Sequence, residues 1–284
     1  MAKVQILADT CCDLTKEQKE KFGIFTVPLY VSLGEKMYRD GVDVFPQMLF
    51  DYFNETQQTP KTSATTVGDY MDFFKPFADE GKDIVYIGLS EKMSCTMANA
   101  KMAAEQMEGA KIYCVDSMNL STGIGLLVLR AAEMAQAGAS AEEIVSAVEE
   151  MRTRVRASFV LDTLEYLRRG GRCSLLAAVG ASILSLHPEI AVSDGSMASR
   201  NKYRGKMAIA AKKYAANLLL ARDNIEDKRV FVTYTAGCAR EIVDAVVGEV
   251  RAAGFEEVLQ SEAGSVISSH CGTNCIGFLF VDKA

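Results

Sequence analysis

The sequence has no apolar run long enough to cross a membrane. Its longest uncharged apolar stretch, Cys173 to Leu186, is interrupted by Gly180 and by several serines. A stretch of this length predicts a buried helix, because a bilayer crossing needs about 20 mostly apolar residues. The N-terminus from Met1 to Asp9 also lacks the apolar segment and cleavage site of a secretory signal peptide. We therefore expect a cytoplasmic protein with no stable membrane insertion.

The signature motifs of several common enzyme classes are also missing. The sequence contains no GxxxxGK(S/T) phosphate loop, no GxSxG nucleophile elbow and no protein-kinase signature set. The dinucleotide-binding pattern GxGxxG is absent too, since Gly123-Ile124-Gly125 lacks the third glycine. These absences disfavour the common nucleotide-binding, hydrolase and kinase classes, and we expect no cofactor.

Charge of one sign is not concentrated on any segment. The 284 residues include 31 Lys and Arg against 37 Asp and Glu, which gives a net charge of −6 and a pI near 5.2. A nucleic-acid partner is therefore not expected, because it would need a basic face. The eight cysteines are expected to be reduced and buried, since a cytosolic chain of this length does not depend on disulfides.

The first half alternates short strand-like runs with helical patterns. Predicted strands are Val4 to Ala8, Phe25 to Val31, Ile84 to Gly88 and Ile112 to Val115; predicted helices are Leu14 to Phe22, Phe45 to Phe53, Val67 to Glu80, Met97 to Met107, Gly125 to Gln136 and Ala141 to Val155. This order predicts an α/β domain, residues 1–157, with a mostly parallel sheet and helices on both faces. Such sheets bind ligands beyond the carboxyl ends of their strands, where polar loops fall here.

The second half predicts another α/β domain, residues 158–284, with a mixed sheet. Asp194-Gly195 is a hairpin signal. Further strands are expected at Val230 to Thr235, Glu257 to Ser261 and Ile276 to Val281, and helices at Gly205 to Arg222 and Arg240 to Ala252. The length of the chain is comfortable for two such domains.

Two hydroxyl-rich loops are candidate anion sites. Thr62 to Thr66 precedes a predicted helix, and Leu89 to Thr96 lies between a predicted strand and a helix. Hydroxyls in these places can cap the helix that follows. They can equally join its free N–H groups in holding a carboxylate or phosphate. The segments alone leave both interpretations open.

Two further segments carry candidate polar groups. Ser268 to Cys275 contains His270, whose imidazole could support a carboxyl group or serve only a structural role. A metal site of His270, Cys271 and Cys275 is the weaker interpretation, because no fourth ligand has suitable spacing. Leu164 to Arg172 predicts a helix that stops at two glycines and presents a cation to an anion or a partner.

Together these segments resemble the DegV family of bacterial lipid-binding proteins from end to end. The family pattern Leu-x-x-Leu-x-x-Gly-Gly-Arg is matched without gaps by Leu164 to Arg172. The other matching segments, in chain order, are Asp9 to Leu14, Val27 to Leu29, Thr62-Ser63, Ser94 to Thr96, Asp116-Ser117, Arg204-Gly205 and Ser268 to Gly272.

The resemblance implies a long-chain fatty acid bound between the two domains. Its carboxyl group would be held by Thr62, Ser63, Ser94 and His270. Some family members present that carboxyl group to a separate ATP-dependent kinase subunit, which makes an acyl-phosphate. The residues implied to support the site or to face the partner are Thr10, Thr96, Gly171, Arg172, Arg204 and Gly272.

Three departures from the family pattern bear on the pocket and on the partner surface. Cys95 replaces a glycine, His187 replaces a lysine before Pro188, and Thr273-Asn274 replace Pro-Gly. Two other functions stay open. One is a Ser–His lipid hydrolase that uses Ser94 and His270, although no orienting acid is evident. The other is a regulatory or interaction protein that depends on bound lipid.

Overall fold

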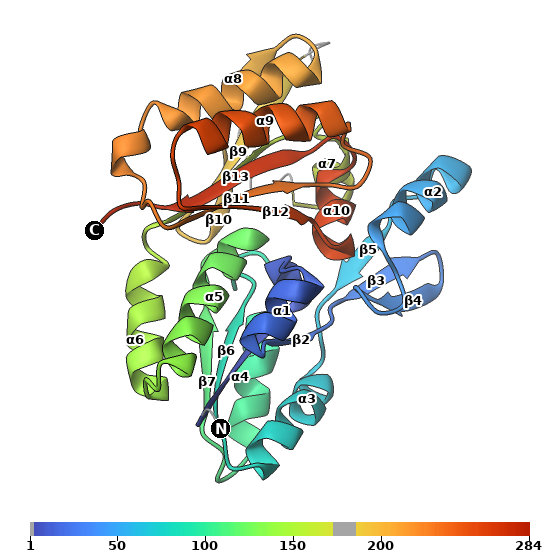
Figure 1. Cartoon of the computed structure of the whole chain (residues 1–284). Coiled ribbons are helices and arrows are strands. Elements are labelled where there is room, and N and C mark those ends of the chain that lie inside the picture. The colour runs from blue at the N-terminus through green and yellow to red at the C-terminus, as the bar shows by residue number, and fades with distance from the viewer. Residues whose placement is uncertain (1–2, 173–185) are drawn as a thin grey trace.

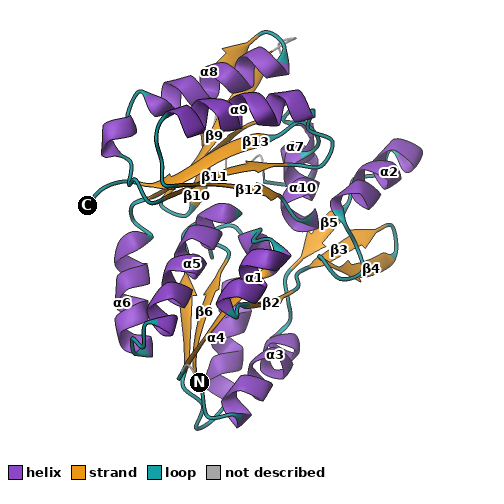
Figure 2. Cartoon of the chain, viewed as in Figure 1, coloured by secondary structure: helices purple, strands orange, loops and turns teal. Residues whose placement is uncertain are grey.

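The computed structural model describes residues 3–172 and 186–284 of the chain. Two α/β bodies lie one above the other, and a small sheet with one helix extends from their side (Figures 1 and 2). The predicted fold class, two α/β units with a parallel and a mixed sheet, is confirmed. The apolar stretch Cys173 to Leu186, predicted as a helix, lies outside the described residues except for Leu186, which begins a strand.

The N-terminal body is built on a fully parallel sheet with strand order β2-β1-β6-β7. Its strands are β1 (Val4–Asp9), β2 (Phe25–Val27), β6 (Asp83–Gly88) and β7 (Ile112–Asp116). Its helices are α1 (Lys16–Phe22), α3 (Val67–Asp79), α4 (Thr96–Gln106), α5 (Thr122–Gln136) and α6 (Ala141–Met151). Ile6 packs with α5 and α6 while Leu7 packs with α3 and α4, because successive side chains of a strand face opposite sides. Helices therefore cover both faces, as predicted.

The C-terminal body contains a mixed sheet with strand order β10-β9-β8-β13-β11-β12. Its strands are β8 (Val155–Val160), β9 (Leu186–Ser193), β10 (Ser196–Arg204), β11 (Arg229–Tyr234), β12 (Glu257–Glu262) and β13 (Ile276–Val281). Only β11 and β12 pair in parallel among the described strands. The helices α8 (Met207–Leu219) and α9 (Arg240–Ala252) cover one face.

The other face of this mixed sheet packs against α5, so one hydrophobic core joins the two bodies. Ile124 and Leu127 of α5 belong to the same buried cluster as Phe231 and Leu279 of the mixed sheet. The change from one sheet to the other occurs between α6 and β8. The predicted boundary at residues 157/158 lies inside β8, and the division into two domains stays a prediction.

The small side sheet was not predicted. It has the order β4-β3-β5 and consists of β3 (Tyr30–Leu33), β4 (Lys36–Arg39) and β5 (Lys61–Ser63), with the helix α2 (Pro46–Thr56) beside it. The predicted strand Phe25 to Val31 is in fact two strands, separated at Pro28, which has no N–H for a sheet hydrogen bond. The stretch 56–66, predicted as a loop, contains β5, whose pairing partner lies far away in the sequence.

Several boundaries also differ from prediction near the site. The predicted helix Ala141 to Val155 ends at Met151, because Val155 already belongs to β8. The segment around His270, which was predicted to be a loop, is the short helix α10 (Ser265–Cys271). A second short helix, α7 (Glu165–Arg169), precedes the two glycines. Two single turns of 3₁₀-helix, η1 (Thr10–Cys12) and η3 (Arg222–Asn224), complete the described elements.

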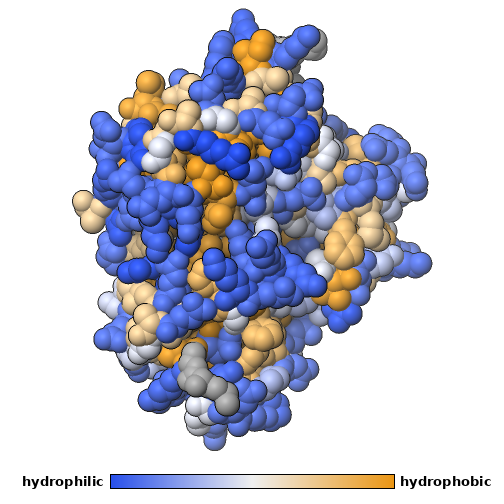
Figure 3. All heavy atoms as spheres, viewed as in Figure 1, coloured by the Kyte–Doolittle hydropathy of each residue, from blue (hydrophilic) through white to orange (hydrophobic). Residues whose placement is uncertain are grey.

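The surface is mostly hydrophilic, with hydrophobic side chains gathered in places (Figure 3). One group lies on the side sheet and its helix, where Met37, Val42, Phe45 and Met48 are exposed. Among the described residues, no helix combines the length and apolar character needed to span a membrane. The seven described cysteines are free thiols.

Candidate functional site

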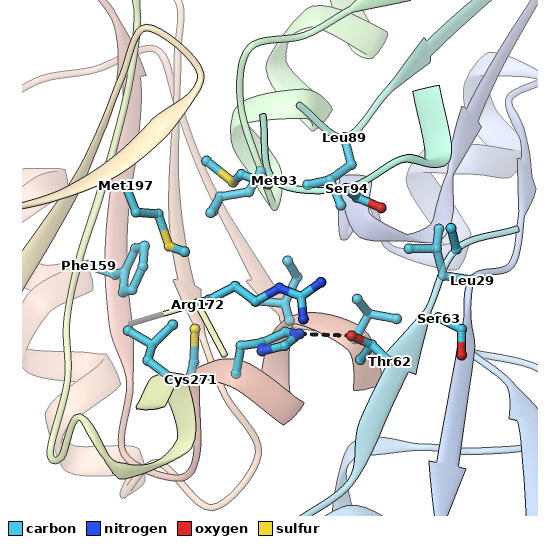
Figure 4. A pocket seen from close by; sticks show the side chains of 16 residues that line it. Leu29, Thr62, Ser63, Leu89, Met93, Ser94, Phe159, Arg172, Met197 and Cys271 are labelled. Carbon is cyan, nitrogen blue, oxygen red and sulfur yellow. Dashed lines mark hydrogen bonds between the residues drawn. The ribbon is translucent and has the colours of Figure 1, made fainter. Parts of the chain in front are cut away.

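A cavity of about 70 Å³ lies where the two bodies and the side sheet meet. Apolar side chains from all three parts line it, among them Leu29, Leu89, Phe159 and Met197. Its polar lining comes from Thr62, Ser63, Ser94, Arg172 and His270 (Figure 4). The fold therefore brings the predicted carboxyl-binding residues to one cavity, although they come from four separate parts of the chain.

Thr62 and His270 are in direct contact across this cavity. His270 Nε2 lies 2.9 Å from Thr62 Oγ1, and the two residues are 208 positions apart in the sequence (Figure 4). Thr62 is held on β5 by its pairing with Val31 of β3, and His270 lies in the last turn of α10. Thr62 therefore does not cap a helix, as had been one interpretation; Thr66 caps α3 instead.

The environment of His270 keeps its imidazole neutral. Burial, and secondly the positive charge of Arg172, lower the pKa of His270 from 6.5 to about 4. Nδ1 is buried and has no hydrogen-bond partner among the described residues. A neutral imidazole carries one N–H and one acceptor nitrogen, so near neutral pH this side chain can pass hydrogen bonds but adds no charge.

Ser94 lies in the loop between β6 and α4 and combines two predicted roles. Its Oγ accepts the backbone N–H of Thr96 at 3.2 Å, and its hydroxyl donates to Thr96 Oγ1 at 3.1 Å. Ser94 therefore caps the start of α4 and also faces the cavity. Cys95, the departure beside it, is exposed.

Ser63 and Arg172 differ in where their side chains point. The Ser63 hydroxyl points away from the Thr62–His270 pair (Figure 4), because neighbouring residues of a strand face opposite sides. Arg172 extends toward Thr62 and donates to the carbonyl of Gly170 at 2.9 Å. It is the charged member of the described cavity lining, so it can attract an anion.

The other predicted residues lie around the cavity rather than in its lining. Thr10 accepts the backbone N–H of Leu29 at 3.4 Å and so supports a lining residue from behind. Thr96 is buried beneath Ser94. Gly171 and Gly272 have left-handed φ values of 72°, which favour glycine. Arg204 is exposed at the end of β10, and its role toward a partner stays a prediction.

The departures at His187 and Thr273-Asn274 also lie outside the lining. The ring nitrogens of His187 face the carbonyl oxygens of Leu161 at 3.3 Å and Gly205 at 2.9 Å. This buried side chain therefore joins the end of the β9–β10 hairpin to the residues that follow β8. Asn274 takes a left-handed φ of 55° in the turn after α10.

A buried acidic pair that holds α10 was not identified from the sequence. Asp13 accepts the N–H of Gly264 at 2.8 Å, and Asp40 accepts the N–H of Ser265 at 2.8 Å. Burial raises the pKa of Asp13 to about 8 and also raises that of Asp40. Asp13 stood in a matched motif, whereas nothing local marked Asp40.

A second cavity of about 20 Å³ adjoins the first and is purely apolar in its exposed lining. The two cavities share the side chains of Leu120, Phe159, Ile267 and Cys271. The second one lies between α10, the start of α5 and the mixed sheet. An apolar path therefore leads from the polar groups toward the core that joins the two bodies.

The geometry offers little for hydrolysis or metal chemistry. No hydrogen bond joins His270 to Ser94 in the described parts of the chain, and Nε2 of the imidazole is engaged by Thr62. Within residues 3–172 and 186–284, no group of three or more His, Cys, Asp or Glu side chains is arranged to hold a metal ion.

Comparison with known proteins places this site in a family. Residues 3–283 match the family model described as an uncharacterised protein of the DegV family. A DegV domain-containing protein of Clostridium acetobutylicum is 32% identical over 286 residues, with 100% of both chains covered.

Solved structures agree over the same length. One described as fatty acid binding of a DegV family protein from Thermus thermophilus has a TM-score of 0.89 at 28% identity, covering 99% of each chain. Another, a stearic acid-binding protein from Eubacterium ventriosum, has a TM-score of 0.85 at 27% identity, covering 99% of this chain and 98% of that one. By sequence and by fold, the chain belongs to the DegV family.

Proposed function

We propose that this protein binds a long-chain fatty acid, with its carboxyl group at Thr62, Ser94 and His270 and its tail in the apolar space beyond them. The observation that carries the proposal is the Thr62–His270 hydrogen bond at the polar end of a cavity that is otherwise apolar. The two solved structures described as binding a fatty acid, or stearic acid, support the same ligand class.

The polar end of the cavity suits a carboxylate. Burial of a carboxylate is costly unless it receives hydrogen bonds. Thr62 and Ser94 carry hydroxyls on its wall, and Arg172 supplies a positive charge. Hydrogen bonds to a charged group are about twice as strong as neutral ones, so a few well-placed donors are enough.

The tail needs more room than the described cavities provide. They measure about 70 and 20 Å³, whereas sites for ligands of this size usually measure about 300–1,000 Å³. The walls around Phe159, Ile267 and Cys271 must therefore separate when the ligand enters. Burial of about 15 methylenes at roughly 0.8 kcal/mol each gives an upper limit near 12 kcal/mol, from which ordering of the ligand and opening of the walls subtract.

In the finer proposal, the protein presents the bound carboxyl group to a separate ATP-dependent kinase subunit in the cytoplasm and needs no cofactor of its own. An exposed apolar group, Met37, Val42, Phe45 and Met48, lies on the side sheet and helix that carry Thr62. Such a patch beside the cavity suits a protein partner. A lipid-dependent regulatory protein would use the same surface, whereas a Ser–His hydrolase gains no support from the contacts of His270.

The decisive experiment is mass spectrometry of an organic extract from the purified protein. A stoichiometric fatty acid would support the proposal and identify the preferred tail. An empty extract, together with no thermal shift on addition of palmitate or stearate, would overturn it. Hydrolysis of a nitrophenyl ester that disappears in Ser94→Ala would instead favour the hydrolase.

A further inference from the structure

The imidazole of His270 is fixed by a hydrogen bond on one side and by a glycine on the other. Nε2 lies 2.9 Å from Thr62 Oγ1, whereas Nδ1 faces Gly170. A Cβ at Gly170 would lie 2.9 Å from Cε1 of the imidazole and closer still to Nδ1. The ring therefore occupies the space that any side chain at position 170 would need.

The backbone does not require glycine at this position. Gly170 follows α7 with φ −74° and ψ 0°, a conformation open to every residue. Its neighbour Gly171 has φ 72°, where glycine is favoured for the backbone's sake. The two glycines thus have different physical reasons, and the reason at Gly170 is the imidazole.

This contact decides where the single proton of the neutral imidazole resides. A proton on Nδ1 would be a buried N–H that has no acceptor among the described residues and would carry the full desolvation penalty. A proton on Nε2 is donated to Thr62 Oγ1. The Nε2–H tautomer is therefore favoured.

We propose that Gly170 is a positioning residue that holds His270 as the Nε2–H tautomer, so that the Thr62 hydroxyl is left free to donate to the ligand. A hydroxyl has one hydrogen to donate and two lone pairs to accept with. When Thr62 accepts from His270, its O–H can point into the cavity and donate to a carboxylate. With the other tautomer, Thr62 would donate its one hydrogen to Nε2 and offer the carboxylate only lone pairs. This last step rests on the proposed function.

The tautomer can be measured without any fatty acid. The chain has two histidines, so ¹⁵N-labelled imidazoles give two ring systems, and a His187→Gln variant assigns them. We expect an unprotonated Nδ1 and a protonated Nε2 for His270 at neutral pH. A protonated Nδ1 in the delipidated wild-type protein would overturn the inference, whatever the protein binds.

Gly170→Ala tests the positioning role, with Gly248→Ala as its matched control. A Cβ at Gly248, which lies in α9, meets nothing within 4 Å. We expect Gly170→Ala to change the tautomer ratio of His270 and to weaken palmitate binding roughly tenfold to a hundredfold. Gly248→Ala should do neither.

A double variant separates displacement of the ring from general disruption of the backbone. In a His270→Ala background the clash no longer exists, so adding Gly170→Ala should have no further effect on unfolding or on palmitate affinity. Fully additive effects would overturn the positioning role. If the protein binds no palmitate but His270 is the Nε2–H tautomer and the stability effects are non-additive, the proposed function fails while the assignment of Gly170 stands.

Discussion

The carboxylate of Asp13 holds the beginning of α10, since its Oδ1 accepts the backbone N–H of Gly264 at 2.8 Å. Its Oδ2 accepts the hydroxyl of Ser121. Asp13 therefore links the turn after β1 to the helix that carries His270. Because this carboxyl group is buried, its protonation is linked to folding.

We expect Asp13→Asn to flatten the decline in stability as pH rises. Burial raises the pKa of Asp13 from 3.8 to about 8 in the folded protein. Its stabilising contribution is therefore fully present below pH 3.8 and is lost as pH rises toward 8. The slope is at most about 1.4 kcal/mol per pH unit. Urea unfolding between pH 5 and about 8 measures it, and parallel curves for both proteins would contradict the assignment. Asp72→Asn, at an exposed position of α3, is the control.

His270→Gln should change stability on the acid side. The folded pKa of His270 is lowered from 6.5 to about 4, so the stability linked to the neutral ring is present above pH 6.5. It is lost as pH falls from 6.5 toward 4, again by at most about 1.4 kcal/mol per unit. The variant lacks this loss. Denaturation at several pH values in this window tests the expectation, which fails if the wild-type and variant curves keep a constant separation.

Thr62→Val should weaken binding of palmitate roughly tenfold to a hundredfold, because a hydrogen bond to the carboxylate is lost. Thr62→Ser keeps the hydroxyl and should bind nearly as well as the wild type. Ser63→Ala is the neighbouring control, since its hydroxyl points away from the pair. Isothermal titration of the delipidated proteins gives the affinities; equal affinities for Val and Ser at position 62 would exclude the hydroxyl from the site.

Cys275→Met should shift the preference toward shorter tails. Cys275 lines the second cavity but not the first, so a longer side chain there would shorten the apolar path. Competition between stearate and laurate measures the preference. Cys238→Met, outside both linings, should leave it unchanged. An unaltered preference in Cys275→Met would mean that the tail takes another route.

Gly272→Ala should be more destabilising than Gly254→Ala. Both glycines have left-handed φ values, 72° and 78°, so alanine costs about 1 kcal/mol at either position. A Cβ at Gly272 would also lie 2.9 Å from Cγ of Tyr166 and closer to other atoms of the ring, whereas one at Gly254 meets nothing within 4 Å. We expect a further loss of about 1–3 kcal/mol, measured by urea unfolding. Equal losses would show that Tyr166 yields freely.

The comparison of Gly272 with Gly170 shows how much the sequence could reveal. Both stood in segments that resemble family motifs, so both could be marked. The reason for each glycine could not be predicted, because Tyr166 and His270 approach them from another helix. Gly170 receives the ring of His270 from α10, and Gly272 receives the ring of Tyr166 from α7.

Element prediction succeeded where local periodicity was strong and failed where pairing was distant. The helices around Tyr70 and Val243 follow from apolar spacing alone. The strand that carries Thr62 is three residues long and depends on β3 for its hydrogen bonds. The short helix that carries His270 depends on Asp13 and Asp40. Short elements of this kind are stabilised by tertiary contacts, which no local pattern encodes.

The sequence by itself determined the alternation of strands and helices, the parallel character of the first sheet, and the residues able to bind a carboxyl group. These features follow from side-chain period and from functional-group chemistry. Only the tertiary structure decided that Thr62 contacts His270, that Ser63 turns away and that an apolar cavity adjoins them. The reason is that these relations are made by segments up to 208 residues apart, which meet only when two sheets pack against one shared core.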